Sequence, residues 1–221
     1  MSPYRPHFVI RRTIVSQKAK SWLLVVAALA GIWLIHHGAG AELIPPQPTA
    51  GQAFAGGPEP QPGSPVAEPL RPSAPVRIRI PSIRVDAAMM RLGLGSDGSL
   101  DVPPAGNRDV VGWYRDGTPP GSKGSAIVAG HVDNAQGPSV FYDLGSLQKG
   151  STVEVVRRDG RTAVFSIDAI EVYESKHFPD KRVYGASPYA SLRLITCGGG
   201  FSKTTGYQGN VVAYAHLTKV R

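Results

Sequence analysis

Cysteine is almost absent from this chain of 221 residues, which contains only Cys197. A single cysteine cannot form an internal disulfide, so it has no cross-linking role within the chain. Lone cysteines are usually small buried hydrophobic residues, but a leftover thiol in an exported protein is a candidate reactive group. This one lies between an apolar run and a glycine-rich turn, in Leu194-Ile195-Thr196-Cys197-Gly198-Gly199.

Acidic residues are missing from the first part of the chain, where the first one is Glu42. Clusters of basic and aromatic residues are also lacking, which argues against nucleic-acid binding. The formal net charge of +8 is otherwise spread along the chain. It suits a domain that works near an anionic membrane or cell wall.

A charge-free segment covers residues 21–41 and contains the apolar run Trp22 to Ile35. About 20 residues at about 1.5 Å each match the thickness of a bilayer core. The basic residues before it predict a cytoplasmic tail over residues 1–20 and an exported C-terminal part. We therefore expect a single-pass signal anchor. A signal peptide cleaved after Ala41 is the alternative, because Ala39-Gly40-Ala41 resembles a cleavage site.

Half of the prolines, ten of the 20, lie between Pro45 and Pro75. Such a segment buries too little apolar surface to offset the entropy cost of ordering, so residues 42–76 are predicted to be an extended linker. The folded domain is then expected over residues 77–221. The expected localisation is the cell membrane, with this domain outside the cell.

Long stretches with helical periodicity are nearly absent from the expected domain, and only residues 140–147 suggest a short helix or turn. Short segments rich in Val and Ile alternate instead with Gly, Pro, Asp and Ser, a pattern typical of a closed β-barrel or a sandwich. The expected strands are 77–80, 82–86, 125–129, 152–157, 162–167, 169–173, 192–196 and 210–216.

A cysteine nucleophile needs a partner that supports thiolate formation and protonates the leaving group, and histidine is the usual choice. His131 follows the expected strand 125–129, where a rigid scaffold meets an open loop. His177 lies in a polar loop, and His216 lies about 26 Å along the last strand from its start. His131 is therefore the best candidate, although a structural histidine at a strand end explains it equally well. The other three histidines, His7, His36 and His37, precede the expected domain.

The segments around His131 and Cys197 resemble the sortases, the cysteine transpeptidases of Gram-positive cell surfaces. The order of the two residues and the strand that follows the cysteine are shared, and the resemblance covers nearly the whole domain. It is closest to the actinobacterial classes F and E, class F more so. The segments that carry it are Ala129-Gly130-His131, Leu194 to Gly199, Ile78 to Ile83, Gly112-Trp113-Tyr114, Val140 to Leu144 and Asn210 to Ala215.

The resemblance implies an all-β fold, an eight-stranded closed barrel with short helices and turns. It implies that Cys197 attacks a Leu-Pro-x-Thr-Gly-like sorting signal between Thr and Gly, and that His131 protonates the departing amine. A peptidoglycan or pilin amine then resolves the thioacyl intermediate, and water is another acceptor. No metal or other cofactor is required.

One position departs from the sortase pattern. Sortases place an arginine at the start of the last strand, and this chain has Gln208 there. A glutamine donates a neutral hydrogen bond, roughly half as strong as a charge-assisted one, so a slower enzyme is expected. Arg193 and Lys203 are other possible cations. Asp133 is either an orienting group for His131 or a solvated loop acid.

Two rival enzymes fit less well. An L,D-transpeptidase places its cysteine in a Ser-x-Gly-Cys-x-Arg context, and papain-like wall peptidases place cysteine before histidine. A catalytically silent sortase-like domain, acting as a binding or scaffolding module, is the rival from another class. The missing arginine supports it, whereas the retained Cys197 and His131 oppose it.

Overall fold

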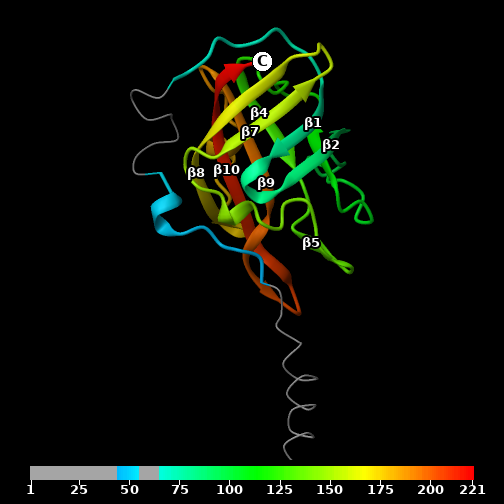
Figure 1. Ribbon diagram of the computed structural model, residues 1–221. Helices are drawn as coiled ribbons and strands as arrows, with labels where there is room; N and C mark the ends of the chain where they lie inside the picture. The colour runs from blue at the N-terminus through cyan, green and yellow to red at the C-terminus, as the bar shows by residue number, and fades with distance from the viewer. Residues whose placement is uncertain (1–43, 55–64) are drawn as a thin grey trace, which may run out of the picture. The chain divides into compact units, whose positions relative to one another are not determined.

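The computed structural model describes residues 44–54 and 65–221, and a closed eight-stranded barrel dominates the described part (Figure 1). The strands follow one another around the barrel in the order β1-β2-β3-β4-β9-β10-β8-β7, and β7 pairs with β1 to close it. The β2–β3 and β4–β9 pairs are parallel, and the other pairs are antiparallel. Their bounds are β1 Pro75–Ile80, β2 Val85–Leu92, β3 Val110–Tyr114, β4 Gly124–Ala129, β7 Thr152–Arg157, β8 Thr162–Glu174, β9 Ala190–Ser202 and β10 Gly206–Val220.

Short elements occupy the connections between these strands. A small two-stranded sheet, β5 and β6, follows β4, and the helix α2 lies in the connection between β8 and β9. Four single-turn 3₁₀ helices complete the described structure. The bounds are β5 Asp133–Asn134, β6 Gly137–Pro138, α2 Asp180–Tyr184, η1 Ala50–Gln52, η2 Pro81–Ile83, η3 Leu144–Ser146 and η4 Ser175–His177.

Alternation along β9 creates two separate hydrophobic clusters. Leu192 and Leu194 point into the barrel and join its main core. Ile195 points to the other face, because successive strand residues face opposite sides, and joins a smaller cluster with Val212 and Tyr214 of β10. Val183 of α2 covers this second cluster. The outer face of β4, β9 and β10 is therefore partly buried.

Two segments within the predicted linker of residues 42–76 contact the barrel. Phe54 packs edge-on against Tyr214 at a ring distance of 5.1 Å, and its backbone N–H donates to Glu171. Further along, the N–H of Ala67 donates to the carbonyl of Leu217. The predicted tail and anchor, residues 1–20 and 21–41, lie outside the described residues. Across residues 44–54 and 65–221, no helix has the length and apolar character needed to cross a membrane.

The prediction of an all-β, eight-stranded closed barrel is confirmed. The two strands expected at residues 162–167 and 169–173 form one continuous strand, β8. A register shift in its pairing with β10, between Tyr214 and Ala215, accommodates the break in the pattern. The strand expected at 82–86 begins only at Val85, because the Pro81–Ile83 turn precedes it. Strand β3 and helix α2 had no clear local pattern and were not predicted as separate elements.

Candidate functional site

The strand pairing aligns the part of the chain that carries His131 with the part that carries Cys197. β4 and β9 are parallel, with Ala129 opposite Ile195, and the next backbone N–H, that of Gly130, donates to the carbonyl of Ile195. Moving two residues along each chain leads to His131 and to Cys197, on the same face of the pair. Because neighbouring strands lie about 4.8 Å apart, we expect the two side chains to be neighbours. The thiol is exposed to solvent.

Gly130 allows the end of β4 to approach the loop that follows. A Cβ atom on Gly130 would lie 2.7 Å from Phe141 and 2.9 Å from Val140. The fully buried Phe141 in turn donates its backbone N–H to the carbonyl of His131. The absence of a side chain at Gly130 therefore lets the core support the backbone that presents the histidine.

One ring nitrogen of His131 has a defined partner. Nε2 lies 2.6 Å from the carbonyl oxygen of Pro103, in the loop between β2 and β3. A carbonyl oxygen only accepts, so Nε2 carries the proton in this hydrogen bond. In the neutral imidazole, Nδ1 is then the basic nitrogen.

Asp133 and Tyr207 shape the electrostatics around the thiol. Although Cys197 is exposed on one side, partial desolvation by the atoms around it raises its pKa, and the Asp133 carboxylate raises that pKa further by disfavouring a second negative charge. The Tyr207 hydroxyl donates to Asp133, and desolvation together with this carboxylate raises the pKa of Tyr207. Asp133 therefore pairs with Tyr207, and among the described residues no hydrogen bond joins it to the ring of His131. The sequence offered no signal for Tyr207.

The three residues considered in place of the usual arginine lie in different surroundings. Gln208 is exposed at a bulge of β10, two residues before Asn210, the strand partner of Cys197. Arg193 is only 5% exposed and stacks over the Tyr214 ring at 4.6 Å, which holds its guanidinium away from the thiol. Lys203 is exposed in the turn between β9 and β10. The role of Gln208 stays a prediction.

The segment before the barrel reaches the turn that follows the nucleophile. Gln47 Oε1 accepts a hydrogen bond of 3.2 Å from the backbone N–H of Gly199. Gly199 has a φ of +74°, a left-handed conformation that glycine adopts without strain. Figure 1 shows the blue segment passing beside the β9–β10 hairpin. Because Gln47 lies within a proline-rich stretch, no sequence pattern indicated this contact.

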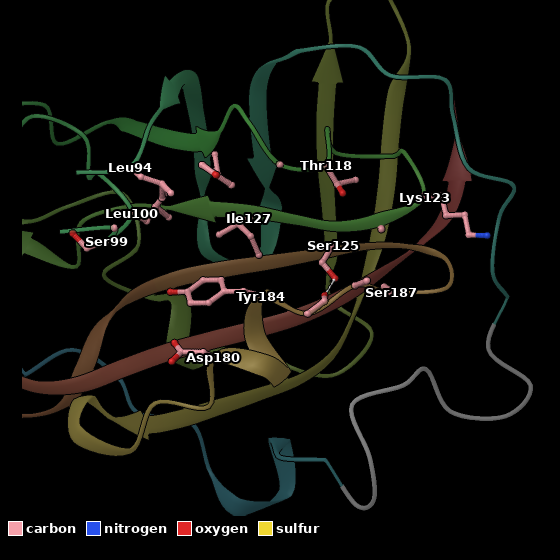
Figure 2. A pocket seen from close by; sticks show the side chains of 16 residues that line it. Leu94, Ser99, Leu100, Thr118, Lys123, Ser125, Ile127, Asp180, Tyr184 and Ser187 are labelled. Carbon is pink, nitrogen blue, oxygen red and sulfur yellow. Dashed lines mark hydrogen bonds between the residues drawn. The ribbon is translucent and has the colours of Figure 1, made fainter. Parts of the chain in front are cut away.

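A groove of about 750 Å³ lies on the outer face of β4. Figure 2 shows Leu94 and Leu100 beside Ile127, with Tyr184 and Asp180 of α2 on the opposite side. Ile127 lies two residues before Ala129 and four residues before His131. Residues two apart in a strand share one face, so all three are expected on the same face of the chain. On β4 the lining of the groove ends at Ile127, four residues before His131. No group of three His, Cys, Asp or Glu side chains within residues 44–54 and 65–221 is arranged to hold a metal ion.

The family comparison decides the identity of this fold. The model of the sortase domain matches residues 78–218, which include both His131 and Cys197. The chain belongs to the sortase family. The family and the fold imply a cysteine transpeptidase, and sortases act on sorting-signal peptides and amine acceptors. No curated protein sequence matches the chain.

Solved sortase structures share the fold at low sequence identity. Listeria monocytogenes sortase A matches at a TM-score of 0.51 and 18% identity, covering 68% of this chain and 90% of that one. The lid mutant of Corynebacterium diphtheriae sortase A matches at 0.51 and 18%, covering 69% and 73%. Sortase E1 from Streptomyces coelicolor, with a tripeptide in its active site, gives 0.49 and 19%, covering 67% and 90%. The matched structures include several sortase classes.

Proposed function

We propose that this sortase is a membrane-anchored transpeptidase that cleaves a Leu-Pro-x-Thr-Gly-like signal between Thr and Gly. The observation that carries the proposal is the parallel register of β4 and β9, which pairs Ala129 with Ile195, two residues before His131 and two before Cys197. The proposed acceptor is an amine of peptidoglycan or of a pilin, and water is the slower alternative. Because its motifs resemble those of classes F and E, we propose class F as the nearest class and class E as the alternative.

The reaction begins at the Cys197 sulfur. The thiolate attacks the threonine carbonyl and forms a tetrahedral intermediate, and the C–N bond to glycine then breaks. His131, protonated at Nδ1 by the thiol proton, donates that proton to the departing amine. The acyl group remains on sulfur as a thioester, so no external energy source is required. The acceptor amine attacks this thioester, returns a proton to His131 and releases Cys197.

The groove beside α2 is the proposed site for the peptide. Its lining is apolar at Leu94, Leu100 and Ile127, which suits the aliphatic residues at the start of such a signal. An extended peptide that leaves the groove along β4 passes Ala129 and then reaches the His131–Cys197 pair. About four residues of extended peptide span this path, because each adds about 3.3 Å.

The developing oxyanion requires hydrogen-bond donors. Gln208 is the proposed side-chain donor, together with a backbone amide. Replacing Gln208 with arginine is expected to preserve or increase the cleavage rate, because a charged donor stabilises an oxyanion more strongly. A lower rate in Gln208→Arg would show that this residue does not occupy the position of the sortase arginine.

The direct test measures transfer of fluorescent sorting-signal peptides to an amine by the full-length chain. Cys197→Ala is expected to abolish transfer and His131→Ala to reduce it by several orders of magnitude. Cys197→Ser and Gly106→Ala serve as nucleophile and folding controls. A thioacyl adduct on Cys197, detected by mass spectrometry, would support the mechanism. Equal transfer by the wild type and Cys197→Ala would refute it.

The second candidate is a sortase-like binding module with little catalytic activity. Two observations favour it: Gln208 replaces a cationic residue, and burial together with Asp133 raises the pKa of the Cys197 thiol, which reduces the thiolate fraction. This candidate predicts peptide binding without an acyl adduct in the wild type. The proposed anchor is tested separately by mass spectrometry of the native N-terminus, where a start at Glu42 would contradict it.

A further inference from the structure

A second cavity, of about 90 Å³, lies behind the wall of the groove next to α2. Its lining contains three cationic residues and no carboxylate. The residues are Lys181, Arg182, Gly185, Ala186, Ser187, Tyr189 and Arg193. The volume equals about three water molecules, at about 30 Å³ each, so a small planar group fits it.

Two buried arginine donors at this cavity lack hydrogen-bond partners. Among the described residues, nothing accepts from the buried Nε of Arg193 or from the buried Nε of Arg182. Arg193 is 95% buried, since its exposed fraction is 5%. Buried polar groups are nearly always paired, so these two donors leave unused hydrogen-bonding capacity on arginines that line the cavity. Both groups are donors only, so a partner that binds them must be an acceptor.

The two nearby carboxylates, Glu171 and Asp168, do not line the cavity, and each has a partner already. Glu171 lies 3.7 Å from Arg182 and accepts the backbone N–H of Phe54. Asp168 lies 2.6 Å from Nδ1 of His216. The Ser187 hydroxyl accepts from the backbone N–H of Tyr189, so its own proton is available to a bound acceptor. The cavity is therefore a donor-rich site whose positive charge is only partly balanced.

We propose that Arg193, Arg182 and Ser187 bind a single carboxylate carried by the peptide substrate. The planar guanidinium group matches a carboxylate in geometry, which a water molecule does not. Lys181, exposed at the opening, adds attraction at longer range. This assignment rests on the proposed function, because it assumes that a peptide lies in the neighbouring groove.

The strand register indicates which part of the peptide carries the acid. Gly185, Ala186 and Ser187 line both the cavity and the groove. Ile127, on the floor of the groove, lies directly opposite Arg193 in the β4–β9 pair. Arg193 precedes Cys197 by four residues, about 13 Å along the strand. An acidic residue about four to six positions before the cleaved bond is therefore the expected ligand.

The first experiment measures anion binding without catalysis. The full-length Cys197→Ala chain is titrated with sodium acetate by calorimetry, at an ionic strength held constant with sodium chloride. Adding Arg193→Met is expected to weaken acetate binding at least tenfold, equivalent to about 1.4 kcal/mol. Adding Arg158→Met, at an exposed position, is expected to have no effect. Arg193→Lys, which keeps the charge, serves as a second folded variant.

The second experiment uses peptide pairs with Glu or Gln four, five or six residues before the cleaved bond. The Glu peptide is expected to bind the Cys197→Ala chain more tightly at one position, and Arg193→Met should abolish that preference. Equal binding of acetate by Arg193→Met, or no preference for Glu, would overturn the assignment. Absence of cleavage by the wild type would contradict the proposed function without changing this binding result.

Discussion

A methyl group at Gly130 provides a sharp test of how the core positions His131, the proposed acid. In Gly130→Ala, the new Cβ would lie 2.7 Å from Cδ2 and 3.0 Å from Cε2 of the Phe141 ring. Ordinary carbon contacts are about 3.5–4.0 Å, so one side has to retreat by about 1 Å. Phe141 is fully buried and has little room to move. The expected cost is about 1–3 kcal/mol in the free energy of unfolding, as for other overpacked cores.

The same strain is expected to reduce activity beyond the loss of folded protein. His131 adjoins Gly130, and a displacement of about 1 Å at a reacting group can lower the rate about 100-fold. Urea unfolding gives the stability, and peptide transfer by the folded fraction gives the rate. Gly106→Ala is the matched control, because nothing lies within 4 Å of its Cβ.

Phe141→Leu provides a rescue, since it removes the ring that the new methyl meets. The double variant Gly130→Ala/Phe141→Leu should therefore lose less stability than the two single losses combined. If Gly130→Ala were as stable and as active as the wild type, the argument for tight packing at the end of β4 would be refuted. Strict additivity in the double variant would show that Phe141 is not the group that resists the methyl.

Three further outcomes follow from other contacts. His216 is buried, which lowers its pKa, but its hydrogen bond and attraction to Asp168 outweigh burial and raise it above 6.5. It therefore stabilises the fold fully at low pH, and the difference in unfolding free energy between wild type and His216→Gln should shrink as pH rises through the raised pKa. Asp133→Asn should lower the pKa of Cys197 and move the acidic limb of the kcat/KM profile to lower pH; an unchanged limb would remove Asp133 from that role. Gln47→Ala removes the hydrogen bond to Gly199 and should cost about 1 kcal/mol or less in unfolding free energy. If its kcat falls further than that of Gly106→Ala, the Gln47–Gly199 contact positions the turn after Cys197.

Local patterns predicted the strands that alternate between polar and apolar residues. The strand expected at residues 152–157 coincides with β7, and the one at 125–129 lies within β4. β3 and α2 were not predicted as separate elements, because five residues in each contain too little periodicity to show their class. The sequence predicts two strands where the structure has the single strand β8. Asp168 interrupts the apolar pattern there, because its carboxylate faces His216. Local alternation cannot reveal a polar residue that is satisfied by a distant strand.

Sequence alone predicted the barrel class, which the structure confirms, and it singled out Cys197 and His131 as candidate nucleophile and partner, because these predictions depend on residue type, order and short periodicity. Only the tertiary structure decided which residues meet. The parallel β4–β9 register aligns the end of β4, which leads to His131, with the part of β9 that leads to Cys197, 66 positions later in the sequence. The antiparallel β9–β10 pair places Arg193 opposite Tyr214, over whose ring its guanidinium lies, and the segment before the barrel places Gln47 against Gly199. Such contacts depend on strand pairing and packing between distant segments, which no local pattern records.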